Sequence, residues 1–455
     1  MLKKIGKVLI PIICLIPLLM GTIGYLCSGE MVTNSLYASF ALYFTNPVSD
    51  AYNGWIEFAR WTAPLVTATA ILCVLKTVWQ NLKWRLSLLG RNDSVAVYSD
   101  EEISIQFENG TRAIYPKETI KKYAKEHILM FSTDEKNLQF YEEHKAQLSG
   151  KAVYIGLKEL ELGSIKEMKN VTLFDSNGSV ARLLWREIAV WKMQKEDCKI
   201  VVYGNGALAQ AMLETGLQWN LFSTNQQVCY DVISSDRYFQ HKHPDMQLMN
   251  GDSIHYFGEE EEQIWDRIAA ADIVIVPEKI PLERLLTIAV RAGNTPVYYY
   301  SPEEGEAANY LAFENLIPYG RNEELLTDGN IRKQELIRRA ILLNEHYVES
   351  YQGEKDWNSL SGFLKASNIS SADYGEVVAA MPSDVPDETL ARLEHIRWCR
   401  FYFLNYWKYG IPENGKGKDP KKRIHKDLVP YEDLAPEERA KDILTIQTWR
   451  KQVQE

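Results

Sequence analysis

A C-terminal stretch of the sequence combines aromatic, acidic and basic side chains at spacings that suit a ligand site. Glu394, Arg397 and Trp398 are three and four residues apart, so they share one face of the helix predicted there. A basic loop at 416–426 follows. Aromatic faces beside such a loop suit a phosphorylated, purine-like ligand, because bases stack on aromatic rings and phosphates pair with cations. In this interpretation the phosphate contacts come from Lys422, Arg423 and His425.

The same residues also have an ordinary structural explanation. Glu394 and Arg397 would form an ion pair, and His395 would be a hydrogen-bonded core residue. Trp398 and Trp407 would fill the core, where large aromatic side chains are most often found. The basic loop would then be a solvated hairpin. Its positive charge nevertheless stands out in a chain with a formal net charge of -10, which favours the ligand interpretation.

The C-terminal sequence resembles the RyR domain, a small module first described as a repeat in ryanodine receptors and also found in bacterial proteins. The matching residues occur in the same order and with matching gaps, and they are Glu394, His395, Trp398, Trp407, Tyr409, Gly410, His425, Leu428, Tyr431, Leu434 and Asp442. The resemblance implies a mostly helical ligand-sensing module at 335–455. The implied ligand-binding residues are Glu394, His395, Trp398, Trp407, Tyr409, Lys422, Arg423, His425 and Tyr431. In bacterial relatives the resemblance points to sensing of nucleotide-derived messengers, often in antiviral defence.

A glycine-rich turn at 204–209 has the G-x-G-x-x-A pattern of dinucleotide-binding folds. Between a predicted strand and a helix, Gly204 permits the tight turn, Gly206 lets the backbone approach a pyrophosphate, and Ala209 allows close helix packing. Asp236 would accept hydrogen bonds from the ribose hydroxyls, and Asp231 is the competing choice for this role. The pattern predicts a site for NAD(H) or another adenine nucleotide. The alternative is a retained fold with an empty cleft.

Short β-rich runs alternate with longer amphipathic stretches after residue 91, as in parallel α/β sheets. This pattern predicts two Rossmann-like units, at 93–196 and 197–334. The expected strands are at 95–98, 128–132, 152–156 and 171–175 in the first unit, and at 199–203, 228–233, 272–277 and 295–300 in the second. The first unit has acidic residues where a phosphate loop needs glycines, so we expect a structural or dimerising copy.

The pair of units resembles the RCK or TrkA-N domains, which are cytoplasmic nucleotide-binding regulators of potassium channels and transporters. The resemblance covers roughly 94–317. No G-x-S-x-G, H-E-x-x-H or P-loop motif occurs in the sequence. We therefore predict neither catalytic residues nor metal ligands.

The first part of the chain, 1–92, is predicted to be a membrane domain with two transmembrane helices. Residues 8–29 contain no charged side chain, and a helix needs about 20 residues to cross the hydrocarbon core. A second span is expected at 58–79, with Arg60 and Lys76 snorkelling from it. Basic residues precede the first span and follow the second. We therefore expect the protein in the cell (inner) membrane, with both termini in the cytoplasm. A secretory signal peptide is the rival interpretation, but no small-x-small cleavage site follows.

An aromatic stretch between the spans, at 36–44, is too short to cross a membrane. The order of span, short helix, loop and span resembles two-span potassium channels, with pore-like positions at Tyr43, Thr45 and Asn46. In place of the filter Thr-Val-Gly-Tyr-Gly the chain has Thr-Asn-Pro-Val-Ser-Asp at 45–50, so potassium selectivity does not follow. The alternative is an aromatic hairpin at the membrane interface.

Length and net charge limit the number of domains and the kinds of partner that the chain can have. A chain of 455 residues requires several domains, and its net charge of -10 argues against nucleic acid as a partner. Together the features predict a homo-oligomeric membrane effector or ion channel, dimeric or tetrameric, in contact with membrane lipid. Its gating ligand would be a nucleotide-like small molecule. The alternatives are a membrane-anchored NAD(P)-dependent enzyme and a passive membrane scaffold.

Overall fold

The computed structural model describes most of the chain, which divides into two compact units, Met1–Arg91 and Asn92–Glu455. The described residues are 2–88, 93–116, 119–160, 165–166, 168–193, 195–303, 305–351, 355–413 and 415–452.

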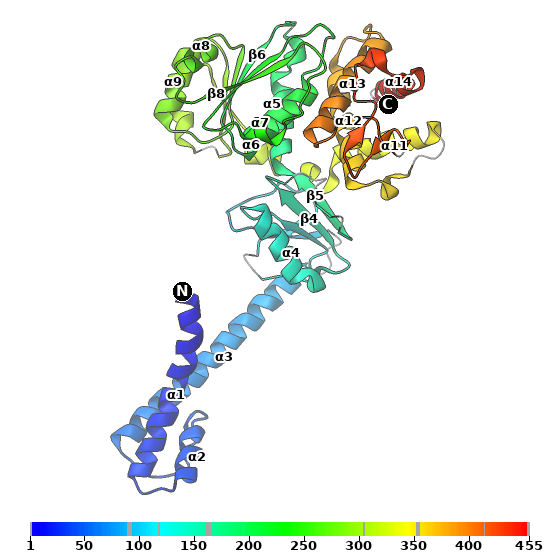
Figure 1. The fold of residues 1–455 in the computed structure, drawn as a ribbon. Coiled ribbons are helices and arrows are strands. Elements are labelled where there is room, and N and C mark those ends of the chain that lie inside the picture. The colour runs from blue at the N-terminus through cyan, green and yellow to red at the C-terminus, as the bar shows by residue number, and fades with distance from the viewer. Residues whose placement is uncertain are drawn as a thin grey trace. The chain divides into compact units, whose positions relative to one another are not determined.

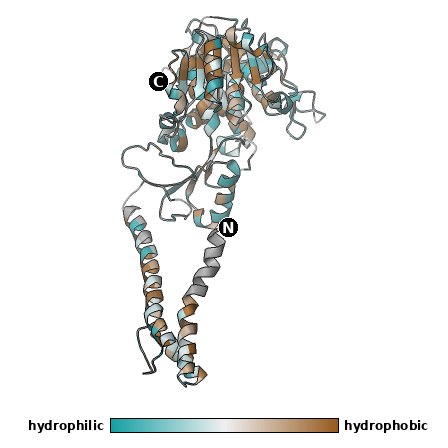
Figure 2. Cartoon of the chain, turned by 90° about the vertical axis from the view of Figure 1, so that its left-hand side faces the viewer, coloured by the Kyte–Doolittle hydropathy of each residue, from teal (hydrophilic) through white to brown (hydrophobic). Residues whose placement is uncertain are grey.

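The first unit is helical and consists of α1 (Leu2–Cys27), α2 (Val32–Leu42) and α3 (Gly54–Leu88) (Figure 1). Within α3, the stretch Gly54–Trp79 is long and apolar enough to cross a membrane. Among the described side chains of α1, the apolar stretch Cys14–Cys27 is shorter than a full span. Hydrophobic residues of both helices are brown in Figure 2. The predicted span at 58–79 is thus matched by a helix of suitable length and composition, and the span at 8–29 stays a prediction.

Small residues let α1 pack closely on α2 and α3. A Cβ atom on Gly21 would lie 2.9 Å from the Ser39 hydroxyl, and one on Gly24 would lie 2.7 Å from the Ile56 side chain. The Gly24 carbonyl also accepts a 2.7 Å hydrogen bond from the Asn53 amide. Close contacts between small residues and polar side chains are how helices associate where lipid removes the hydrophobic drive.

The predicted pore segment contains a short helix, although α2 both begins and ends earlier than the expected 36–44. Tyr43 follows α2, and its hydroxyl donates to the Cys14 carbonyl at 2.5 Å. Thr45 has a positive φ of 57° and is exposed, like Asn46. These residues form the turn that ends the helix. Their pore-lining role stays a prediction.

The second unit begins with a parallel sheet in the order β2-β1-β3-β4-β5. Its elements are β1 (Ser94–Tyr98), β2 (Arg112–Ile114), β3 (Glu126–Leu129), α4 (Asp134–Leu148), β4 (Ala152–Leu157) and β5 (Val171–Asp175). The predicted strands overlap β1, β3, β4 and β5, and the sequence analysis missed β2. Side-chain caps mark the first turns of two helices. Thr133 accepts from the Lys136 amide at the start of α4, and Asp175 accepts from the Gly178 amide at the start of the helix that follows β5.

A second parallel sheet follows, in the order β11-β10-β9-β6-β7-β8, which is the strand order of the dinucleotide-binding Rossmann fold. The Rossmann-like prediction is therefore confirmed at the level of the fold. The strands are β6 (Lys199–Tyr203), β7 (Cys229–Ser234), β8 (Ser253–Gly258), β9 (Ile273–Val276), β10 (Val297–Tyr300) and β11 (Leu316–Tyr319). The helices are α5 (Ser176–Ile188), η2 (Val190–Lys192), α6 (Ala207–Trp219), α7 (Tyr238–Lys242), α8 (Ile264–Ala269), α9 (Leu282–Ala292), η3 (Ala307–Tyr310), α10 (Asn322–Leu325) and η4 (Gly329–Lys333).

The C-terminal region is mostly helical, as predicted. It contains α11 (Glu335–Ser350), η5 (Trp357–Ser359), α12 (Gly362–Ala380), α13 (Asp387–Leu404), η6 (Tyr431–Asp433) and α14 (Pro436–Gln452). A small sheet in the order β12-β14-β13 joins β12 (Lys408–Tyr409), β13 (Lys418–Asp419) and β14 (Ile424–His425). Figure 1 shows these helices, in yellow to red, beside the green second sheet.

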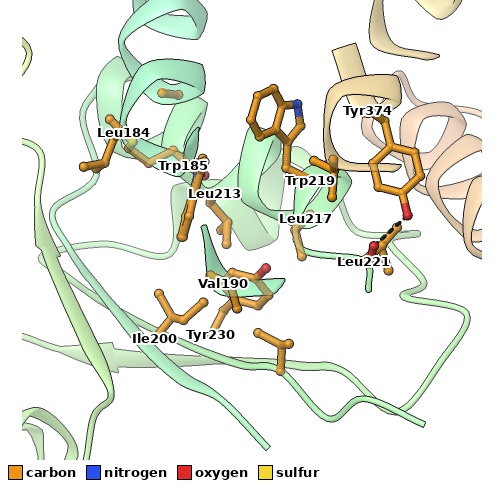
Figure 3. Packing of buried hydrophobic residues seen from close by; sticks show 14 of the residues in the cluster. Leu184, Trp185, Val190, Ile200, Leu213, Leu217, Trp219, Leu221, Tyr230 and Tyr374 are labelled. Carbon is orange, nitrogen blue, oxygen red and sulfur yellow. Dashed lines mark hydrogen bonds between the residues drawn. The ribbon is translucent and has the colours of Figure 1, made fainter. Parts of the chain in front are cut away.

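One hydrophobic core joins the second sheet to the C-terminal helices. Trp185 on α5, Leu217 on α6, Tyr230 on β7 and Tyr374 on α12 belong to the same buried cluster. Figure 3 shows these side chains together, with the Tyr374 hydroxyl donating to the Leu221 carbonyl at 2.6 Å. The C-terminal region is therefore not an independent module attached by a linker, because removing it would expose the core of its neighbour.

The chain returns to the first sheet after β11. The buried Arg332 guanidinium of η4 donates to Asp93 at 2.7 Å and to Glu126 at 2.9 Å, and it also pairs with Asp328. Residue Gln106 forms a parallel bridge with Thr327. The first sheet is therefore completed by residues that the sequence analysis placed in the second unit.

Arg400 on α13 is fully buried between the second sheet and the C-terminal helices. Its guanidinium donates to the Leu217 carbonyl at 2.7 Å, the Leu248 carbonyl at 2.9 Å, Asn250 at 2.7 Å and the Asp252 carboxylate at 2.6 Å. A buried charge is tolerated only when its donors are satisfied and a counter-charge is close. Arg400 meets both conditions.

Replacing Arg400 with alanine is expected to destabilise the full chain by about 3–5 kcal/mol, because Asp252 would be left buried without its cation. Urea unfolding of the purified protein in detergent would measure this loss. The matched control is Arg392→Ala on the same helix, whose partner Glu432 is exposed, with an expected cost below about 1 kcal/mol. Similar small losses in both variants would contradict the role assigned to Arg400.

Candidate functional site

A cavity of about 250 Å³ opens among the C-terminal helices. Its walls come from α11, α12, α13 and α14, and from the β13 to β14 region. Its polar lining residues are Asn344, Ser367, Asn368, Ser371, Glu394, His395, Arg397, Lys418, His425, Asp427, Glu438, Lys441, Asp442 and Thr445. Its aromatic lining residues are Tyr347, Trp398 and Tyr402.

Trp398 is the centre of the aromatic wall. Its ring lies 4.3 Å from that of Tyr402 and 5.6 Å from that of His395, which is nearly parallel to it. The His425 ring meets it edge-on at 5.0 Å. Neighbours on several sides hold the indole in one orientation, so it offers a fixed flat surface to a planar ligand.

Glu394 and Arg397 form the predicted ion pair, and it is buried beside the cavity. Arg397 donates to both carboxylate oxygens of Glu394, at 2.6 and 2.8 Å. Ser371 donates to the same carboxylate at 3.0 Å, and Arg397 also donates to Ser370 at 2.6 Å. Two-point pairing of this kind fixes both side chains. The pair thus serves the packing of α12 against α13 and also provides polar edges for a ligand.

His395 has an acceptor on each ring nitrogen. Nε2 lies 2.8 Å from the Val429 carbonyl, and Nδ1 lies 3.5 Å from the Asp442 carboxylate. Burial alone would lower the pKa of His395, but hydrogen bonding to Asp442 and to the Cys399 thiol raises it to about 11. Acceptors near both ring nitrogens favour the form with two N–H donors, which is the imidazolium.

His425 has the opposite electrostatics. Burial, followed by the charges of Lys418, Lys426 and Lys441, lowers the pKa of His425 to about 3. The Asp427 backbone amide donates to its Nδ1 at 3.2 Å, which leaves the proton of the neutral ring on Nε2. The cavity therefore presents one charged and one neutral imidazole on the two sides of Trp398.

Charges of both signs line the cavity in balance. The carboxylates belong to Glu394, Asp427, Glu438 and Asp442, and the cations to His395, Arg397, Lys418 and Lys441. Such a lining, with a flat aromatic face, suits a compact ligand that has a ring and several hydrogen-bonding groups. The volume lies below the range of about 300–1,000 Å³ usual for drug-sized ligands, so the cavity fits a mononucleotide-sized molecule better than an intact dinucleotide.

Several residues of the predicted site lie outside this cavity. Trp407 is buried, stacks on Phe363 at 5.1 Å and, with Arg423, lines a neighbouring cavity of about 310 Å³. Tyr409 is exposed on β12, and the exposed Lys422 pairs with Glu413 at 3.0 Å. Tyr431 is buried and packs edge-on against His395. The structure thus brings together Glu394, His395, Trp398 and His425 of the predicted set.

Some lining residues were not identified from the sequence. Lys441 comes from α14, next to the motif residue Asp442, and Asn344 comes from α11, well before the motif in sequence. Asn368 donates to Asn344 at 3.2 Å, so the two amides join α12 to α11 in the cavity wall. The available signal was a set of polar residues, Ser367, Asn368, Ser370 and Ser371, in the helix α12.

The glycine-rich turn of the second sheet has the expected local structure. Gly204 has a φ of 138°, which only glycine adopts readily, and Gly206 precedes α6 as its N-cap. Ala209 is buried against the sheet. A carboxylate of the chain itself lies in the turn: Glu278 Oε1 accepts from the Asn205 amide at 2.7 Å and from the Gly206 amide.

Glu278 takes the place that a phosphate oxygen would take at a helix N-terminus. A Cβ atom on Gly204 or Gly206 would lie 2.8 Å from this carboxylate. Asp236 follows β7 and lines the adjoining groove of about 570 Å³, and its side chain accepts from the Tyr238 amide at 2.9 Å. Asp231, the competing choice, lies within β7, where its carboxylate pairs with His255. Of the two acids, only Asp236 faces the groove.

Comparisons with protein-family models, with curated proteins and with solved structures found no match. The resemblances to RyR and to RCK or TrkA-N domains therefore stay predictions, and the parallel sheets are compatible with the Rossmann-like part of them.

Replacing Glu278 with alanine is expected to free two backbone amides and to strengthen binding of NAD(H) by about tenfold or more, because a competing anion is removed. Isothermal titration of the full chain and of Glu278→Ala would test this, with Glu283→Ala on the outer helix α9 as the control. Weaker binding in Glu278→Ala would instead make Glu278 a direct ligand contact.

The His395 pKa predicts a pH dependence of stability. Between the ordinary pKa of 6.5 and the folded value of about 11, the folded state keeps a proton that the unfolded state loses. Stability should therefore fall as pH rises through this window, by up to about 1.4 kcal/mol per pH unit. Unfolding of the native chain and of His395→Gln at pH values from 7 to 9 would show a flatter curve for the variant. Parallel curves would contradict a charged His395.

Proposed function

We propose that the protein is a membrane-anchored sensor that binds a compact nucleotide-like ligand in the C-terminal cavity and thereby alters its membrane helices. The observation that carries the proposal is the rigid, charge-balanced aromatic cavity around Trp398. The resemblance to RyR modules supports the same role, and antiviral defence is the biological setting that it implies.

Ligand binding has a direct mechanical route from the cavity to the second sheet. Arg397 lines the cavity and Arg400 binds the sheet region, and one turn of α13 separates them. A ligand that prefers one position of α13 would therefore shift the packing of α13 on α6. Such a ligand changes the equilibrium between two states only by its difference in affinity for them.

The membrane end completes the proposal. α3 contains the apolar stretch Gly54–Trp79 and ends at Leu88, and β1 starts at Ser94, so a short stretch of backbone links them. In this proposal α1 is a second span, both termini are cytoplasmic, and copies of the chain associate as a dimer or tetramer to form a pore or to disturb the lipid. A selective potassium channel is less well supported, because the filter sequence is missing.

An NAD(P)-dependent enzyme is the weaker alternative. The Rossmann strand order and the groove beside Asp236 favour dinucleotide binding. Glu278 in the phosphate turn opposes it. A passive scaffold would not require the balanced charges of the cavity.

Thermal shifts of the full chain in detergent would test ligand sensing, with NAD(H), NADP(H), ATP, ADP-ribose and cyclic nucleotides as probes. A bound ligand at one hundred times its Kd stabilises by about 2.7 kcal/mol. We expect the shift to disappear in Trp398→Ala and in Ser367→Phe, which fills the cavity. It should persist in Trp357→Ala, whose side chain lies outside the cavity lining.

The same variants in liposomes would test the effector role. The active ligand should release a trapped dye or ions from vesicles that contain the native chain, and Trp398→Ala should abolish release. A ligand shift that survives in both cavity variants would refute the cavity as the sensor. Ligand binding without any release would agree with the proposed ligand sensing and refute the proposed effect on the membrane.

A further inference from the structure

A Cys, Asp and His cluster lies on one face of the second sheet, away from the C-terminal cavity. Cys229 and Asp231 are two residues apart on β7, so their side chains point to the same face. His255 on β8 is the register partner of Asp231. The pleat and the strand register together therefore bring three different donor types to one point.

The three donor atoms are close to one another. Cys229 Sγ lies 3.4 Å from Asp231 Oδ1 and 3.4 Å from His255 Nδ1, and the last two atoms are 3.1 Å apart. In a tetrahedral zinc site with bonds of about 2.0–2.3 Å, neighbouring ligand atoms are about 3.3–3.6 Å apart. The observed triangle needs only a few tenths of an ångström of expansion to hold the ion.

The surroundings support the carboxylate as a ligand. Asp231 is buried, and its second oxygen, Oδ2, lies 3.7 Å from the Arg267 guanidinium, while Oδ1 faces Cys229 and His255. Arg267 itself lies over the Phe257 ring at 4.9 Å. Outer groups of this kind orient a ligating carboxylate. The His255 side chain is 48% exposed, so an ion can enter from the solvent.

We propose that Cys229, Asp231 and His255 bind one divalent transition-metal ion, of which zinc is the best match, with water as the fourth ligand. Thiolate, carboxylate and imidazole are each established zinc ligands. Binding displaces the thiol proton of Cys229 to solvent. The ion joins the edge strand β8 to β7, so it stabilises the sheet margin. The proposal does not depend on the sensor function.

The competing explanation is a set of ordinary hydrogen bonds, since the same distances allow the thiol and the imidazole to donate to Asp231. Zinc content and cobalt spectra separate the two explanations. The purified full chain in detergent would be stripped with chelator, incubated with zinc, desalted and analysed for bound metal. With cobalt, a bound thiolate adds a charge-transfer band in the near ultraviolet.

We expect one zinc per chain and a thiolate band in the native protein. Cys229→Ser and His255→Gln should weaken zinc binding by about tenfold or more, and Cys229→Ser should remove the band. Cys198→Ala, a buried thiol on the same domain, and His241→Gln, an exposed imidazole, are the matched controls and should bind normally.

Two results would overturn the proposal. One is a folded native chain that holds no more zinc than Cys229→Ser. The other is equal binding in all four variants, which would place the ion elsewhere. Melting curves in chelator check that each variant folds. If Cys229→Ser does not fold, zinc binding by His255→Gln, which changes an exposed side chain, tests the proposal.

Discussion

The buried guanidinium of Arg400 is the interaction on which the second unit depends. It satisfies two carbonyls, one amide and one carboxylate, all from the sheet region, while its own helix also forms a wall of the cavity. Hydrophobic packing around Trp185 and Tyr374 is broad but has no preferred direction. Hydrogen bonds to a planar cation are directional, so Arg400 fixes the rotation and the height of α13.

The two candidate ligand regions, the C-terminal cavity and the glycine-rich turn, differ in whether the chain itself already occupies the anion-binding groups. The C-terminal cavity is bounded by helices, and several of its lining charges are paired with one another, as Glu394 is with Arg397 and Lys441 with Glu438. The glycine-rich turn is an anion site that a chain carboxylate fills. A ligand must therefore displace Glu278 to use the turn, whereas no chain carboxylate has to be displaced from a backbone anion site for a ligand to lie beside Trp398. For this physical reason the proposed ligand site is the cavity in the helical region and not the glycine-rich turn.

Local features of the sequence predicted the structure well. The buried strand at 199–203, the turn at Gly204 and the pair formed by Glu394 and Arg397 all depend on neighbours within a few residues, and all are present. The missed strands β2, β8 and β11 lie at sheet edges, where one side is solvated and the hydrophobic run is short or interrupted, as by Pro318. Contacts distant in sequence were beyond such reasoning. Arg400 and Asp252 are 148 residues apart, and Glu278 and Asn205 are 73 apart.

The return of the chain to the first sheet has a consequence for biosynthesis. Asp93 and Glu126 lie beside the buried Arg332, which is made more than two hundred residues later. On the ribosome the first sheet therefore emerges with two neighbouring carboxylates and no cation between them. Domains usually fold from the N-terminus as they are synthesised. We therefore expect the first sheet to gain its full stability only after Arg332, and with it the second sheet, has emerged.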